Sequence, residues 1–416
     1  MSKKSNKRDK TFCPAPFKSV AVSASGTWTL CCESNTNYTH PGGHRHINET
    51  GTLEEWFNGD YMTSVRKSML AGEPLKECEW CYKTEALGAQ SLRQRFLEDE
   101  VLNADFDPER PTVEYLEIRF GNKCNLKCKM CFPHASSELA KEWRALGWHL
   151  EDPARDDRKE YYNGYMEADY DWPRDRNNIV KLLSAVGTTK LIKFTGGEPM
   201  LSPQMFSFME HCVKHGLAPD IELHVITNCT KIHPRFLDLV RKFKRLTMTL
   251  SVDGLGRTYD YIRYPARWSQ VEANILRYRS WYQSGLVRGK LGISAVLGVF
   301  NLHQMVELVR DAHRLTGDAG GVHPYDMDHP GFMSWRHAPI ETQRRAMRDA
   351  VRLAHDTDPA LASSGRRLCG ILRRRNQVPT TESRAKLREF VTQQDGLRGI
   401  HIGDYIPHLV ETMRVD

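Results

Sequence analysis

The sequence predicts an α/β protein built on a parallel β-sheet, and two observations lead to this prediction. Between residues 112 and 326, apolar segments of strand length alternate with segments of helical spacing. The strand segments are largely continuous in apolar residues, which is typical of a parallel sheet covered by helices on both faces. Such a sheet closes into a barrel or stays open and doubly wound. In both forms ligands bind at the carboxyl ends of the strands.

Six strands are expected in this region, with helices between them. They are residues 113–120, 190–197, 221–228, 245–254, 291–300 and 320–328. A polar and aromatic insertion at residues 151–173 precedes the second strand and is either a lid over a substrate or a surface excursion. Residues 327–416 predict a mainly helical extension.

The cysteine-rich region at residues 12–95 is expected to form a small α+β domain, followed by a linker at residues 96–111. Residues 20–22 and 28–30 predict a short hairpin. The apolar spacing between residues 53 and 69 predicts a helix that ends near Gly72.

Length and composition limit the class of protein. The 416 residues, 40% of them hydrophobic, suffice for two or three domains. No apolar run approaches the roughly 20 residues that cross a bilayer, and the first ten residues lack the apolar core of a secretory signal. We therefore expect a soluble cytoplasmic protein with no membrane partner. In that reducing compartment the eleven cysteines predict metal ligands or reactive thiols rather than disulfides.

The net charge of +7 is concentrated at the start of the chain. Residues 1–10 carry a net +4, so the rest of the chain carries only +3. We expect residues 1–11 to be a disordered basic tail and nucleic acid not to be a partner. A second basic run, from Arg366 to Arg375, is more typical of a solvated helix face than of a site for an anionic partner.

Three cysteines follow the first expected strand of the sheet. Cys124, Cys128 and Cys131 form a CxxxCxxC pattern in the segment "GNKCNLKCKMCF". Thiolates so close in sequence can surround an iron-sulfur centre. Three ligands leave one metal position open for a substrate or cofactor, whereas a closed structural site takes four. On these residues alone a zinc knuckle remains the alternative.

This pattern resembles the signature of the radical S-adenosylmethionine (radical SAM) enzymes. The resemblance implies a partial (β/α)6 barrel over residues 112–326. It also implies that the three cysteines hold a [4Fe-4S] cluster whose fourth iron binds the amino and carboxylate groups of S-adenosylmethionine. Reduction then cleaves this cofactor to a 5'-deoxyadenosyl radical.

Motifs at four further strand ends are similar to those of the same family and imply the residues that bind S-adenosylmethionine. The second strand ends in a GGEP motif, whose glycines allow close backbone approach and whose carboxylate can accept from an ammonium, although an ordinary strand-to-helix turn is also compatible with it. A TNG-like turn, an SxDG motif, an arginine-bearing segment and an apolar adenine contact follow. The implied cofactor-binding residues are Gly196, Gly197, Glu198, Asn228, Ser251, Asp253, Arg263 and Val299. The chain departs from the family at Cys229, where the TNG-like turn usually has glycine, and at Met130, where an aromatic residue is common.

A second group of cysteines lies in residues 13–81. Cys13, the pair Cys31 and Cys32, Cys78 and Cys81 supply four ligand positions, which suit a closed cluster. The segments around them resemble the twitch or SPASM-type auxiliary module of radical SAM enzymes, placed before the barrel. A four-cysteine zinc site remains the alternative.

Only one cysteine of the adjacent pair can readily enter such a cluster, because neighbouring residues on a strand point to opposite faces. In the module the pattern runs from a glycine through four residues to its cysteine, which implies Cys31 after Gly26. We therefore expect Cys32 to be turned away. Cys212 and Cys369 are expected to be buried helix residues.

The resemblance implies an enzyme that abstracts a hydrogen atom from a small-molecule or peptide substrate. The auxiliary cluster would accept an electron, giving an oxidation or bond formation that includes peptide modification, and a flavodoxin or ferredoxin would supply reducing electrons. Two alternatives remain: an epimerase in which Cys229 is the catalytic hydrogen donor, and a non-enzymatic iron-sulfur or zinc protein. His323 and Tyr325 are polar residues at a strand end without an assigned role.

Overall fold

The computed structural model describes residues 10–34, 45–86, 90–104, 107–148, 170–317, 322–327, 330–374 and 378–413. These residues contain one eight-stranded sheet with the strand order β2-β1-β3-β4-β5-β6-β7-β8. All neighbouring strands are parallel except the β1–β2 pair. The strands are β1 (Ser19–Val22), β2 (Trp28–Thr29), β3 (Tyr115–Arg119), β4 (Leu191–Thr195), β5 (Glu222–Thr227), β6 (Arg245–Ser251), β7 (Gly289–Leu297) and β8 (Val322–Asp326).

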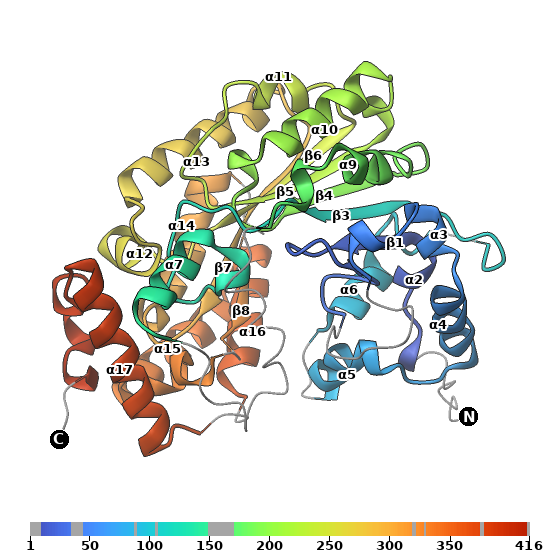
Figure 1. Ribbon diagram of the computed structural model, residues 1–416. Coiled ribbons are helices and arrows are strands. Elements are labelled where there is room, and N and C mark those ends of the chain that lie inside the picture. The colour runs from blue at the N-terminus through green and yellow to red at the C-terminus, as the bar shows by residue number, and fades with distance from the viewer. Residues whose placement is uncertain are drawn as a thin grey trace.

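Strands β3 to β8 alternate with helices, which confirms the predicted α/β class. Figure 1 shows the sheet bent around an inner side, with α10, α11 and α13 on its outer side. The helices of this part are α7 (Ser137–Ala145), α9 (Arg176–Leu183), α10 (Pro203–Lys214), α11 (Phe236–Val240), α12 (Gly256–Ile262), α13 (Trp268–Gln283) and α14 (Met305–Thr316). The carboxyl ends of these strands therefore share one rim, as the prediction requires.

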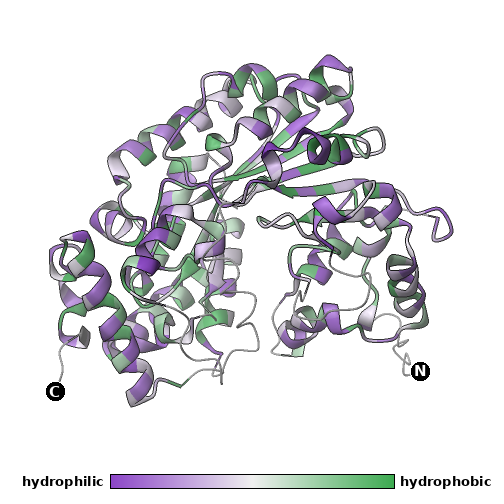
Figure 2. Cartoon of the chain, in the orientation of Figure 1, coloured by the Kyte–Doolittle hydropathy of each residue, from purple (hydrophilic) through white to green (hydrophobic). Residues whose placement is uncertain are grey.

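The two faces of the strands differ in burial. In β4, β5 and β6, buried residues alternate with partly exposed ones. The buried residues belong to the main hydrophobic core. Figure 2 shows hydrophobic and hydrophilic residues interspersed along the strands.

The hairpin predicted in the cysteine-rich region is present, but it extends the main sheet. Strand β1 pairs in parallel with β3, so that Ala21 lies opposite Glu117. A two-stranded hairpin alone is marginally stable in water, and pairing with β3 supplies the missing backbone partners. The helices of this region are α2 (Ala15–Lys18), α3 (Leu53–Phe57), α4 (Asp60–Ala71), α5 (Glu79–Ala86) and α6 (Leu92–Glu98).

The C-terminal part is mainly helical, as predicted, and consists of α15 (Ile340–Ala354), α16 (Pro359–Leu372) and α17 (Thr381–Arg398). Helix α17 is tied to the loop after β3 by buried charges, since Lys129 Nζ donates to Asp395 at 2.7 Å. No helix of the described residues is long and apolar enough to cross a membrane. The predicted basic tail up to residue 9 and residues 151–169 of the predicted insertion lie outside the described residues.

Candidate active site

The loop after β3 brings Cys124, Cys128 and Cys131 together. Its backbone is held by Lys129 N, which donates to Ile262 O at 2.9 Å, and by Lys127 N, which donates to Tyr264 O at 2.7 Å. Burial raises the pKa of all three thiols, and the proximity of Cys128 raises the pKa of the other two further. Iron would relieve this cost, because metal binding deprotonates a coordinating thiol.

Two polar side chains, one directly after β5 and one at the end of α12, point at these sulfurs. Asn228 Nδ2 lies 3.8 Å from Cys124 Sγ, and Arg263 Nη1 lies 3.9 Å from Cys128 Sγ. Hydrogen bonds to thiolate sulfur tune an iron-sulfur cluster and neutralise part of its charge. Three adjacent thiols with N–H donors directed at them therefore fit the [4Fe-4S] cluster that the sequence implies.

The GGEP turn packs directly against the cysteine loop. A Cβ at Gly197 would lie 2.2 Å from Lys123 O, and Gly196 adopts φ +114°. Only glycine fits both positions, because the backbones approach closely and the conformation at Gly196 excludes most side chains. The turn thus fixes the distance between β4 and the loop that carries the three cysteines.

Glu198 has an internal role in addition to any contact with a cofactor. One carboxylate oxygen accepts from Met200 N at 3.0 Å and from the Thr227 hydroxyl at 2.7 Å, and the other accepts from Asn228 N at 2.7 Å. The side chain is 3% exposed. Glu198 therefore holds the end of β5 in place and positions Asn228 beside Cys124.

Asp253 and Arg263 form the polar link between β6, β7 and the cysteine loop. Arg263 Nε donates to Asp253 at 2.6 Å, and the other Asp253 oxygen accepts from Val296 N at 2.7 Å. Burial lowers the pKa of Arg263, but Asp253 and Cys128 raise it more, so it stays above its ordinary value. The guanidinium is thus held in its charged form next to Cys128.

Ser251, Val299 and Cys229 complete the predicted strand-end set. Ser251 is the last residue of β6, and Val299 is buried with its N–H donating to Met333 O. Cys229 lies in the turn after β5 at φ +60°, which accounts for the glycine that the family usually has there. Its thiol is buried and donates to Thr227 O at 3.6 Å.

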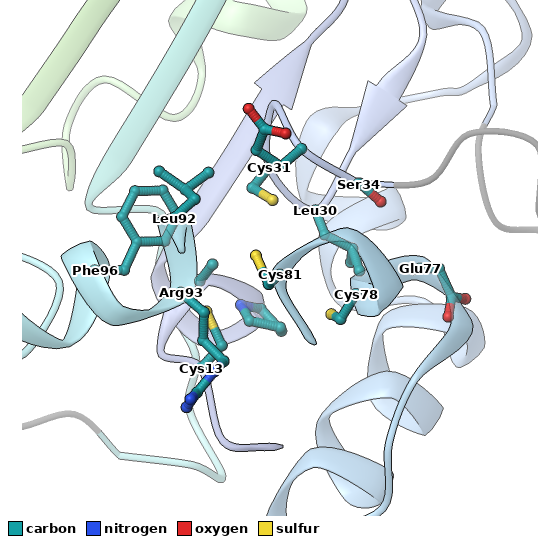
Figure 3. Close-up of a pocket in the computed structure, with 13 residues that line it drawn as sticks. Cys13, Leu30, Cys31, Ser34, Glu77, Cys78, Cys81, Leu92, Arg93 and Phe96 are labelled. Carbon is teal, nitrogen blue, oxygen red and sulfur yellow. The ribbon is translucent and has the colours of Figure 1, made fainter. Parts of the chain in front are cut away.

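The second predicted cysteine group lines one pocket in the N-terminal region, a space of about 400 Å³ with its open mouth included. Figure 3 shows the sulfurs of Cys13, Cys31, Cys78 and Cys81 directed toward a common space. These residues come from before α2, after β2, and the start of α5. Within the described part of the chain, no three cysteine, histidine or carboxylate side chains converge as they would around a single metal ion.

Cys32 lies outside this cavity, on the inner side of the sheet. Burial raises the pKa of its thiol to about 12, and the nearby Glu117 contributes to the rise. The structure places Cys31, and not Cys32, with the other three thiols.

The structure contains a cluster of charged and polar side chains on one face of the sheet that was not predicted from the sequence. Glu117 accepts from Lys193 at 3.1 Å, Arg119 at 3.3 Å and the Tyr115 hydroxyl at 3.2 Å, and His224 lies on the next strand. The signal was present, because these charged residues occupy alternate positions in strands that otherwise read as apolar.

Comparison with known proteins agrees with this geometry. Residues 118–312 match the model of the radical SAM superfamily. The chain contains a radical SAM domain. The GTP 3',8-cyclase of Chlorobaculum tepidum is 24% identical over 242 residues, 58% of this chain and 62% of that protein.

Two solved structures are among those similar to this chain. One is anSMEcpe with bound AdoMet and Cp18Cys peptide, at 18% identity and a TM-score of 0.36, over 59% of this chain and 61% of that one. The other is Streptococcus suis SuiB bound to S-adenosylmethionine, at 16% identity and a TM-score of 0.34, over 70% of this chain and 61% of that one. The chain spans about three fifths of the length of each of these three proteins.

Proposed function

We propose that this protein is a radical SAM enzyme with two [4Fe-4S] clusters, which oxidises a small-molecule or peptide substrate or forms a new bond in it. The observation that supports it best is the cysteine loop, with Asn228 and Arg263 directed at its sulfurs. The four thiols around the N-terminal cavity support the second cluster.

When bound, the first cluster supplies the electron that cleaves S-adenosylmethionine to methionine and a 5'-deoxyadenosyl radical, and the second supplies an acceptor for an electron from the substrate. The chain's own residues bind and orient. In this proposal Gly196, Gly197, Asn228, Ser251 and Arg263 bind S-adenosylmethionine at the rim. Glu198 and Asp253 hold Asn228 and Arg263 in place, and Val299 contacts adenine.

The substrate would occupy the inner side of the sheet, where hydrogen abstraction can follow. The inner-face cations Arg119 and Lys193 lie there, where both donate to Glu117. A flavodoxin or ferredoxin would deliver the reducing electrons. The role of Cys229 as hydrogen donor stays a prediction, and no observation favours it, because its buried thiol already donates to Thr227 O.

Anaerobic reconstitution tests the proposal. We expect about eight irons per chain and release of 5'-deoxyadenosine after addition of reductant and S-adenosylmethionine. Joint replacement of Cys124, Cys128 and Cys131 by alanine should abolish this release and leave about four irons. Cys212→Ala is the matched control, since Cys212 is buried in α10 away from both groups. Bound zinc, or no cleavage by the iron-loaded chain, would contradict the proposal.

A further inference from the structure

A large cavity lies where the N-terminal region meets the far edge of the sheet. It encloses about 1440 Å³, the open mouth included, and is lined by residues of α5, α6, β8 and α16. Arg95 of α6 reaches across it to Tyr325 of β8, with Nη1 donating to the hydroxyl at 3.0 Å. The cavity therefore lies beside the edge strand β8, which is next to α16 (Figure 1).

Three arginines line this cavity with few counter-charges. Arg95 and Arg367 have only neutral side-chain partners among the described residues, namely the Tyr325 hydroxyl and His323 Nδ1 at 2.9 Å. Arg95 Nε is buried without any hydrogen-bond partner. An unsatisfied buried guanidinium nitrogen is costly, and its donor is available to a ligand.

The remaining charges around the cavity do not cancel this positive charge. Arg374 is 3.8 Å from Asp326, but that carboxylate also serves Arg336 at 3.5 Å. Glu33 is the other carboxylate that lines the cavity, so two carboxylates face three arginines there. Burial lowers the pKa of Arg367, and the neighbouring Arg95 and Arg374 lower it further. Like charges are thus held together in a partly buried space.

We propose that this cavity binds a phosphate group of the substrate. Guanidinium groups present planar forks that pair with phosphate oxygens, and a dianion with several acceptor oxygens can satisfy two or three of them together. A single carboxylate carries one charge and two oxygens, so it matches fewer of these donors. The chemical class of the substrate is therefore a phosphorylated small molecule.

The cavity lies close to the proposed second cluster. Its role in catalysis rests on the proposed function. Cys81 lines both this cavity and the one with four cysteines, so the two spaces are neighbours. Glu33 lines both as well. A substrate anchored by its phosphate would lie beside the second cluster, with its other end directed to the inside of the sheet.

Binding of pyrophosphate to the iron-loaded full-length chain tests the inference. Calorimetry should give a Kd of about 1 mM or tighter, and malonate, a dicarboxylate, should bind at least about tenfold more weakly because it fills fewer guanidinium forks. Arg367→Gln and Arg95→Gln should each weaken pyrophosphate binding by about tenfold. Arg366→Gln is the matched control, because Arg366 is the exposed neighbour on α16 and does not line the cavity.

The outcomes separate this inference from the proposed function. Absence of pyrophosphate binding, equal binding by malonate, or unchanged affinity in both Arg367→Gln and Arg95→Gln would overturn it, with circular dichroism showing that each variant is folded. Release of 5'-deoxyadenosine without substrate measures the proposed function alone. Cleavage of S-adenosylmethionine without pyrophosphate binding would support the proposed function and contradict the phosphate site. Pyrophosphate binding without cleavage would support the phosphate site and contradict the proposed function.

Discussion

At the scale of single residues, the adjacent cysteines make the sharpest prediction. Cys31→Ala should lower the iron content from about eight to about four per chain, because Cys31 lines the four-cysteine cavity. Cys32→Ala should retain all the iron, because Cys32 does not line that cavity. Iron and sulfide analysis with electron paramagnetic resonance of the reduced protein checks both variants. The reverse pattern would mean that Cys32 is the ligand.

Arg263 allows a second prediction at this scale. Arg263→Lys should lower the rate of S-adenosylmethionine cleavage about tenfold or more, because an ammonium cannot donate to Asp253 and reach Cys128 as the planar fork does. Iron content should be unchanged, so that the loss is one of cofactor positioning. The release of 5'-deoxyadenosine is the measurement.

Arg267→Lys is the control for this change, because Arg267 is mostly exposed and pairs with Asp260 at 3.6 Å. If the Arg263→Lys variant cleaves the cofactor at the original rate, Arg263 does not position it.

At the scale of elements, the sequence predicted the strands well and their surroundings less well. All six expected strands of the main sheet are present, because each is a short apolar segment between turn residues. The charges within them were overlooked, although Glu117, Lys193 and His224 fall at inward positions. The pairing of β1 with β3 was also not predicted, since strand order depends on contacts between segments nearly 100 residues apart.

The charge pair between β3 and β4 predicts a pH dependence of stability. Glu117 and Lys193 lie opposite each other in register on β3 and β4. Their side chains form a largely buried ion pair at 3.1 Å. Burial raises the pKa of Glu117, but Lys193, Arg119 and hydrogen bonds lower it more, to about 2. The folded state thus binds a proton less readily than the unfolded chain. This stabilisation is fully present above about pH 5 and is lost as the pH falls toward 2.

Glu117→Gln should therefore lower the free energy of unfolding at pH 7 by about 3 kcal/mol, because it leaves the buried Lys193 without its carboxylate. The difference between the variant and the original chain should shrink as the pH falls from 5 to 3. Urea unfolding at several pH values measures it. Glu210→Gln is the control, since its pair with Arg235 is exposed. A difference that is constant with pH would contradict the assigned charge of Glu117.

At the scale of the whole molecule, the sites depend on contacts that sequence patterns cannot show. The CxxxCxxC motif could be recognised in the sequence because its spacing is local. The bond between Arg95 and Tyr325 joins residues 230 positions apart, and that between Lys129 and Asp395 joins residues 266 apart. Neither pair has a local pattern that indicates its partner. Consequently candidate cluster ligands could be named from the sequence, whereas the cavity proposed for the substrate could not.

The shared sheet predicts that the N-terminal region and the barrel unfold as one unit. All four residues of β1 are buried, and β1 covers the edge of β3, so removing it would expose apolar side chains and unpaired backbone groups. A chain that starts at residue 107 should aggregate, or melt several degrees below the full-length chain, since losing about 2 to 4 kcal/mol shifts the melting temperature of a chain this size by about 3 to 6 °C. Calorimetry of the full-length iron-free chain should show a single transition that includes both parts. Two separate transitions, or a shortened chain that melts at the original temperature, would mean that the cysteine-rich region is an independent domain whose strand merely rests against the sheet.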